Sequence, residues 1–79
     1  MRFILKNKVY EISKDDVIEK MRGVQPEVFR KYYIQINNMQ YPPKQIIARV
    51  LELGRVEFTT MDAINILKRL GFELEGNKS

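Results

Sequence analysis

Two consecutive prolines, Pro42 and Pro43, set the firmest boundary in this chain. Proline lacks a backbone N–H and restricts the residue before it to extended geometry, so a strand is predicted to end at Tyr41. Proline also suits the first turn of a helix, where its missing N–H is harmless, and Pro43 therefore predicts a helix over residues 43–53. Lys44 then falls in the first helical turn, where exposed N–H groups and a cation together suit an anion.

The residues before the prolines predict a β-hairpin. Residues 32–36, YYIQI, alternate in polarity as a strand with one buried face does. Asn37 and Asn38 follow, and asparagine tolerates the positive φ that a two-residue hairpin turn requires. Residues 39–41 then return as the second strand.

Short strands are also expected near both ends of the chain. Residues 2–6 and 8–12 predict two strands, or a loose hairpin, around Asn7. Residues 72–75 predict a final strand that could pair with these N-terminal strands. Residues 76–79 are expected to form a frayed tail.

Two helices have a capping box at their start, in which a hydroxyl and a carboxylate three positions later each accept a backbone N–H of the other residue. The two predicted boxes are Ser13 with Asp16, and Thr59 with Asp62. Glycine readily adopts the positive φ that ends a helix. The predicted helix ends are at Gly23, Gly54 and Gly71.

These elements predict one α+β domain over residues 1–79, with three main helices, a central β-hairpin and short terminal strands. Pro26 adds one or two helical turns within residues 25–33, because it fits a first helical turn and apolar residues follow it. The C-terminal half, helix, short connection and helix, is compatible with a helix-turn-helix unit. The central hairpin could then serve as a wing, giving a winged helix-turn-helix.

Composition argues against catalysis. The chain has no cysteine and no histidine, so it lacks thiolates, disulfides and the commonest metal ligand and proton shuttle. Its four glycines are dispersed and form no phosphate-binding loop. At 79 residues it also buries only about 60 to 65% of its unfolded surface, which leaves little room for a deep catalytic cleft. We therefore expect no enzyme activity, metal or cofactor.

A net charge of +4 favours contact with polyanions. In a helix-turn-helix, the second helix approaches base edges, while flanking cations and helix N-termini hold phosphates. The candidate nucleic-acid-binding residues are Arg30, Lys31, Tyr41, Lys44, Arg49, Arg55, Thr59, Thr60 and Asn65. Lys68 and Arg69 are explained by the dipole at the end of the last helix. DNA is favoured over RNA as the ligand, and a solvated basic face is the competing interpretation.

Three tyrosines, Tyr32, Tyr33 and Tyr41, surround the predicted hairpin. Rings on a sheet can stack single-stranded bases. In a domain of this size, however, tyrosines more often fill the edges of the core with their hydroxyls in water. The second interpretation is preferred at this stage.

The last half to two thirds of the chain resembles small uncharacterised prokaryotic proteins and the N-terminal modules of some restriction-type HNH endonucleases. The resembling features are the hairpin that ends in Tyr41-Pro42-Pro43-Lys44, the Phe58-Thr59-Thr60 connection and the Leu70-Gly71-Phe72 close. The resemblance implies an accessory DNA-binding role for Tyr41, Lys44 and residues 58–60. It implies no nuclease activity, because an HNH site needs histidine.

A protein-interaction module, such as an antitoxin-like or adaptor subunit, is the alternative function. It would use apolar residues at the surface and could form a homodimer or bind another protein. The residues considered for this patch are Val24, Val28, Met39 and Val56. No signal peptide or membrane span is predicted, so we expect a cytoplasmic protein without membrane contact.

Overall fold

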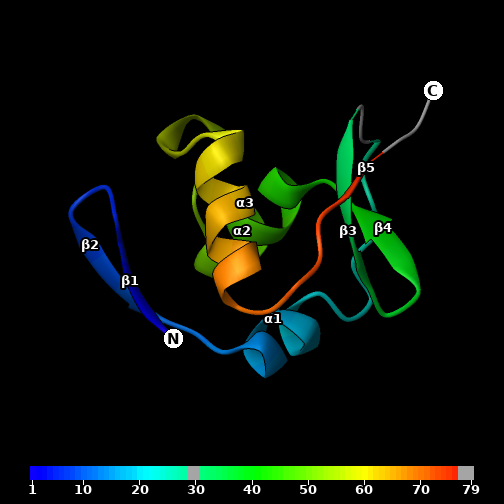
Figure 1. Cartoon of the computed structure of the whole chain (residues 1–79), viewed down its shortest axis with the longest axis horizontal. Coiled ribbons are helices and arrows are strands. Elements are labelled where there is room, and N and C mark those ends of the chain that lie inside the picture. Colours follow the sequence, from blue (N-terminus) through cyan, green and yellow to red (C-terminus); the bar gives the residue numbers. More distant parts are fainter. Residues whose placement is uncertain (29–30, 77–79) are drawn as a thin grey trace.

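The computed structural model describes residues 1–28 and 31–76. These residues form a small α+β domain with three α-helices and two small antiparallel sheets, which confirms the predicted fold class (Figure 1). The elements are, in chain order, β1 (Arg2–Leu5), β2 (Lys8–Glu11), α1 (Lys14–Lys20), β3 (Tyr32–Ile36), β4 (Met39–Tyr41), α2 (Pro43–Leu51), the 3₁₀ helix η1 (Arg55–Glu57), α3 (Thr60–Arg69) and β5 (Glu75–Gly76).

The first sheet is the N-terminal hairpin of β1 and β2, as expected around Asn7. Lys6 and Asn7 form its turn with φ values of 53° and 67°. Both angles are positive, as a tight two-residue hairpin turn requires. Phe3 turns inward and stacks on Tyr10, with ring centroids 5.6 Å apart. The hairpin lies at one end of the molecule, and the second sheet lies at the other with the helices between them (Figure 1).

The second sheet has the strand order β4-β3-β5. Its predicted hairpin is confirmed, and the turn residues Asn37 and Asn38 have φ values of 53° and 65°. Ile34 and Ile36 point from β3 into the core. The prediction that the C-terminal strand could pair with the N-terminal strands is wrong, because β5 pairs with β3. Phe72 is buried after α3, and the chain beyond it runs beside β3, far from the N-terminal hairpin (Figure 1).

Both predicted capping boxes are present. The Ser13 hydroxyl accepts the Asp16 N–H at 3.1 Å, and the Asp16 carboxylate accepts the Ser13 N–H at 2.9 Å. Thr59 and Asp62 repeat this pattern with the same two distances. Because backbone N–H groups bind the charged form, the pKa of each aspartate is held below its ordinary value. Gly71 follows α3 with a φ of +102°, as predicted.

The end of α2 differs from the prediction. The helix stops at Leu51, and Glu52 adopts the left-handed conformation with a φ of 56°. Leu53, which packs partly against the core, donates its N–H to the Ala48 carbonyl at 3.1 Å. Gly54 therefore does not end the helix, because Glu52 already adopts the left-handed conformation two residues earlier. This apolar contact after the helix accompanies many helix ends of this type.

Residues 24–28 contain no regular secondary structure, so the helical turns predicted from Pro26 are wrong over that stretch. Val28, which was expected on the apolar face of those turns, is 93% exposed. The part of the prediction that falls on Phe29 and Arg30 lies outside the described residues.

The central element is α2, which packs against α1, α3 and β3. It places Ile46, Ile47 and Val50 in the core. The connection from α2 to α3 runs over residues 52–59 and contains η1. It is longer than the turn of about three or four residues that joins the helices of a helix-turn-helix. The two prolines at the start of α2 and the capped start of α3 thus fix the two helix N-termini around which the site is built.

Candidate functional site

A surface groove of about 340 Å³ lies where α2 and α3 begin. Three separate parts of the chain line it: residues 28, 31 and 32, the start of α2 with the proline before it, and the first residue of α3. The lining residues are Val28, Lys31, Tyr32, Pro42, Pro43, Lys44 and Thr60. Three residues predicted to bind nucleic acid, Lys31, Lys44 and Thr60, therefore lie together.

The groove combines an apolar floor with cations. Pro43 is buried, and Tyr32 and Pro42 are half-buried. Lys31 is exposed and places its Nζ 5.4 Å from the centroid of the Tyr32 ring. Flat apolar surface beside an ammonium group suits a ligand that carries both an apolar part and negative charge.

Lys44 is half-buried and points from α2 toward η1. Its Nζ donates to the Arg55 carbonyl at 2.7 Å and lies 5.2 Å from the centroid of the buried Phe58 ring. An ammonium group has three donors, and the carbonyl uses one of them. Lys44 is thus fixed in direction and keeps donors for an anion in the groove.

Arg55, also predicted to contact phosphate, is engaged within the chain. Its guanidinium donates two hydrogen bonds to the Glu27 carboxylate, at 2.9 and 2.6 Å. The hydrogen bond from Arg55 holds the pKa of Glu27 below its ordinary value, and Glu27 raises the pKa of Arg55. Because a bidentate partner already neutralises its charge, Arg55 is a weak candidate for phosphate contact.

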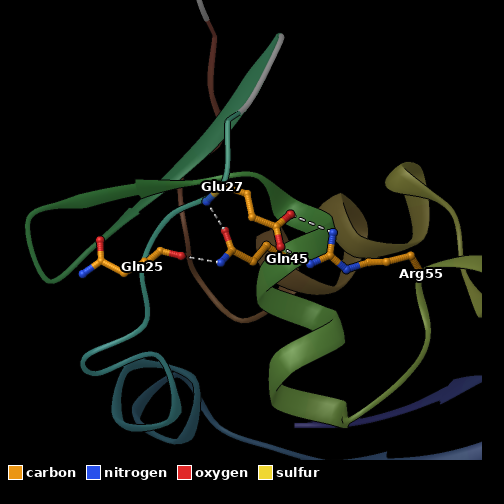
Figure 2. A network of polar contacts seen from close by, with 4 residues as sticks. All are labelled: Gln25, Glu27, Gln45 and Arg55. Carbon is orange, nitrogen blue, oxygen red and sulfur yellow. Dashed lines mark hydrogen bonds and ion pairs between the residues drawn. The ribbon is translucent and has the colours of Figure 1, made fainter.

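Gln45, in α2, binds the backbone of residues 25 and 27, the stretch that also carries the Glu27 carboxylate (Figure 2). Its amide oxygen accepts the Glu27 N–H, and its amide nitrogen donates to the Gln25 carbonyl, both at 2.8 Å. The side chain is only 6% exposed. These bonds occupy backbone groups that a helix would use for itself, which is a further reason that residues 24–28 are not helical. The two prolines predict that Gln45 lies with Lys44 in the first turn of this helix, but nothing in the sequence indicates that its amide binds the backbone of residues 25 and 27.

Tyr41 is fully buried and so does not line the groove. Its hydroxyl donates to the Val24 carbonyl at 2.7 Å and lies 3.3 Å from the Met21 carbonyl. Tyr41 therefore holds the turn after α1 against β4. Its predicted role as a binding residue does not fit this position.

A family model described as SCO5918-like matches residues 1–79. The chain belongs to the SCO5918-like family. No curated protein and no solved structure matches it.

Two further predicted residues of the SCO5918-like domain lie away from the groove. Arg49 follows Lys44 by five positions, which places it about 140° around the helix. It lines another depression, together with Lys20 at the end of α1. Asn65 is exposed and follows Thr60 by the same interval, so it too faces another direction.

The remaining predicted residues of this SCO5918-like chain are Thr59 and Arg30. Thr59 is exposed next to Thr60, and its hydroxyl accepts the Asp62 N–H at the start of α3. Its role in the structure is that of a helix cap. Arg30 lies outside the described residues.

Within residues 1–28 and 31–76, no three acidic side chains lie close enough to hold a metal ion. None of the helices in that part of the chain is long and apolar enough to cross a membrane.

Proposed function

We propose that this domain binds nucleic acid, with DNA favoured, through the groove at the starts of α2 and α3, and that it does so without catalysis. The observation that carries the proposal is that Lys31, Lys44 and Thr60 come from three separate stretches and line one groove. Convergence of this kind is the expected property of a binding surface, whereas cations of a merely solvated face need no common location.

The helix termini add to the positive character of the groove. α2 begins at Pro43 and α3 at Thr60, and both residues line it. Helix N-termini carry partial positive charge, which favours phosphate. Pro43 itself has no N–H to donate, and the Asp62 carboxylate already caps the start of α3, so the contribution comes mainly from α2 and Lys44. Insertion of α3 into a DNA groove, as in a helix-turn-helix, is not part of the proposal, because Thr60 and Asn65 face different ways.

The charge available to a ligand is smaller than the sequence alone predicts. The salt bridges found in the described part of the chain engage Arg2, Arg22 and Arg55, but neither Lys31 nor Lys44. A lysine without a salt bridge can bind phosphate without first breaking an ion pair with a carboxylate. The resemblance to DNA-binding modules points to the same end of α2, where it overlaps the groove at Lys44.

Fluorescence anisotropy with labelled duplex DNA, single-stranded DNA and RNA, at about 50 and about 200 mM salt, tests this proposal. With two phosphates neutralised by Lys31 and Lys44, log K for duplex DNA should fall with log salt with a slope of about −2. Lys31→Gln and Lys44→Gln should each reduce the slope by about 1. Lys68→Gln, at the far end of α3, is the matched control and should change nothing. Binding that ignores salt, or that both groove variants leave intact, would contradict the proposal.

Protein association is a second candidate function, favoured by the outer face of the N-terminal hairpin. Ile4 and Val9 are cross-strand partners there, and they are 72% and 62% exposed. Of the residues considered earlier for an apolar patch, Val24 packs against the core, whereas Val56 is 97% exposed. A paired apolar face on a two-stranded sheet could be covered by a second copy of the chain.

Sedimentation equilibrium separates the two functions. A dimer that the double variant Ile4→Thr, Val9→Thr dissociates would support association through the hairpin. A monomer at all concentrations, in both the parent and the variant, would remove self-association as the function. The nucleic-acid proposal does not depend on this result, since the groove and the hairpin are separate surfaces.

A further inference from the structure

The groove offers more than positive charge, because its floor is built from rings. We propose that it holds a single unstacked nucleotide, with the base against Tyr32 and the two prolines and the adjoining phosphate at Lys31 and Lys44. The inference rests on the proposed function and specifies its ligand as a single strand or an extruded base.

The environment of Tyr32 supports a base contact. In the pairing of β3 with β5, the residue directly opposite Tyr32 is Gly76. A cross-strand neighbour normally packs on the side chain facing it, but glycine has none to contribute. The Tyr32 ring is therefore left half-buried and borders the groove. A base can stack on such a ring whatever its identity, because every base has a π-face.

The arrangement of Lys31 and Tyr32 fits the two parts of a nucleotide. The Lys31 ammonium lies beside the ring face, 5.4 Å from its centroid, and the Lys31 side chain is exposed. It can move from the ring to a phosphate while the base occupies the ring. Lys44 lines the same groove from the start of α2, with its direction fixed by the Arg55 carbonyl. Both cations thus line the groove together with Tyr32 and the two prolines.

The size of the groove limits the ligand to a small unit. Its volume of about 340 Å³ is near the lower end of ligand pockets, which span roughly 300 to 1,000 Å³. One base with its phosphate is of this order, whereas a folded partner or a longer peptide segment is not. In a duplex the base faces are covered by stacking, so only a single strand or an extruded base presents a face to Tyr32.

The test compares two labelled single strands of equal length and charge, an oligothymidylate and an abasic oligonucleotide that lacks bases. Both offer the same phosphates, so phosphate contact alone binds them equally. Fluorescence anisotropy should show the oligothymidylate binding roughly tenfold more tightly, as expected for about one stacked base. Tyr32→Ala should remove this difference and keep the salt dependence, while Tyr32→Phe should preserve both. Circular dichroism establishes that each variant is folded.

The outcomes separate the two proposals. Equal, salt-dependent binding of the two strands by the parent protein would overturn the base contact and leave the phosphate-binding function standing. This comparison needs no variant, so it holds even where Tyr32→Ala fails to fold. Absence of binding to either strand and to duplex DNA would overturn both proposals.

Discussion

The carboxylate of Glu27 meets the guanidinium of Arg55 in a bidentate ion pair, with nitrogen–oxygen distances of 2.6 and 2.9 Å. The Arg55 carbonyl accepts the Lys44 ammonium, and the Glu27 N–H donates to Gln45. Because Lys44 and Gln45 are neighbours in α2, the four residues close a ring of contacts that joins α2, η1 and the segment before β3. Figure 2 shows the Gln45, Glu27 and Arg55 part of this ring. The ring thereby fixes Lys44, the member of the ring that lines the groove.

Glu27→Gln should weaken the ring. Both partners are about half exposed, so solvent screening limits the effect to about 0.5 to 1 kcal/mol at neutral pH, near the upper range for a bidentate surface pair. Arg55 lowers the folded-state pKa of Glu27 below 4.5, so this stabilisation is present above about pH 4.5 and is lost as the pH falls through the lowered value. Urea denaturation across pH should show the two proteins converging in acid. Glu73→Gln, an exposed carboxylate, is the control, and a pH-independent difference would contradict the account.

Gln45→Leu should destabilise the fold by about 1 to 3 kcal/mol, because it leaves the Glu27 N–H and the Gln25 carbonyl without their partner. Gln40→Leu, at an exposed position of β4, is the matched control and should stay within about 0.5 kcal/mol of the parent. Chemical denaturation measures both. Equal stability of the two variants would show that the two hydrogen bonds of the Gln45 amide contribute nothing.

Tyr41→Phe should cost about 1 to 2 kcal/mol of stability, because the buried hydroxyl donates to the Val24 carbonyl. It should leave the affinity of the folded protein for nucleic acid unchanged, since Tyr41 is fully buried. Thermal unfolding and anisotropy at a temperature where both proteins are folded provide the two readings. If folded Tyr41→Phe binds nucleic acid more weakly than the folded parent, Tyr41 contributes to binding and this prediction is wrong.

Local rules in the sequence predicted much of this fold. A hydroxyl followed three residues later by a carboxylate correctly predicted the starts of α1 and α3. The Asn37-Asn38 pair correctly predicted the hairpin turn. Both features act on backbone groups nearby in the chain. Pro43 likewise marked the start of α2. In each case the deciding contact joins residues only a few positions apart.

The remaining features depend on contacts between distant residues. The segment before β3 lacks a helix partly because Gln45, 18 positions after Glu27, binds its backbone. From the sequence, Arg55 was predicted to be free to contact phosphate. In the structure it pairs with Glu27, which lies 28 positions away in the chain. Charge, propensity and spacing do not encode such pairings. The sequence predicted that Lys31, Lys44 and Thr60 bind nucleic acid, but it did not indicate that the three residues line one groove.

Glu52→Gly should stabilise the domain by about 1 kcal/mol. Glu52 has a φ of 56° at the end of α2, a conformation that is strained for a residue with a Cβ and relaxed for glycine. Asn38→Gly is the matched control: its φ is 65°, but asparagine tolerates this region, so a smaller gain is expected. Differential scanning calorimetry measures the change, and a lower midpoint for Glu52→Gly would contradict the assigned helix end.

Backbone-amide chemical-shift mapping with unlabelled oligothymidylate tests the central claim most directly, because it reports where on the domain the ligand lies. The account predicts that the largest shifts fall on Lys31, Tyr32, Lys44 and Thr60, and that Ile4 in the N-terminal hairpin is unaffected. Shifts centred on the hairpin or on the face that carries Arg49, or the absence of any shift at saturating ligand, would contradict it.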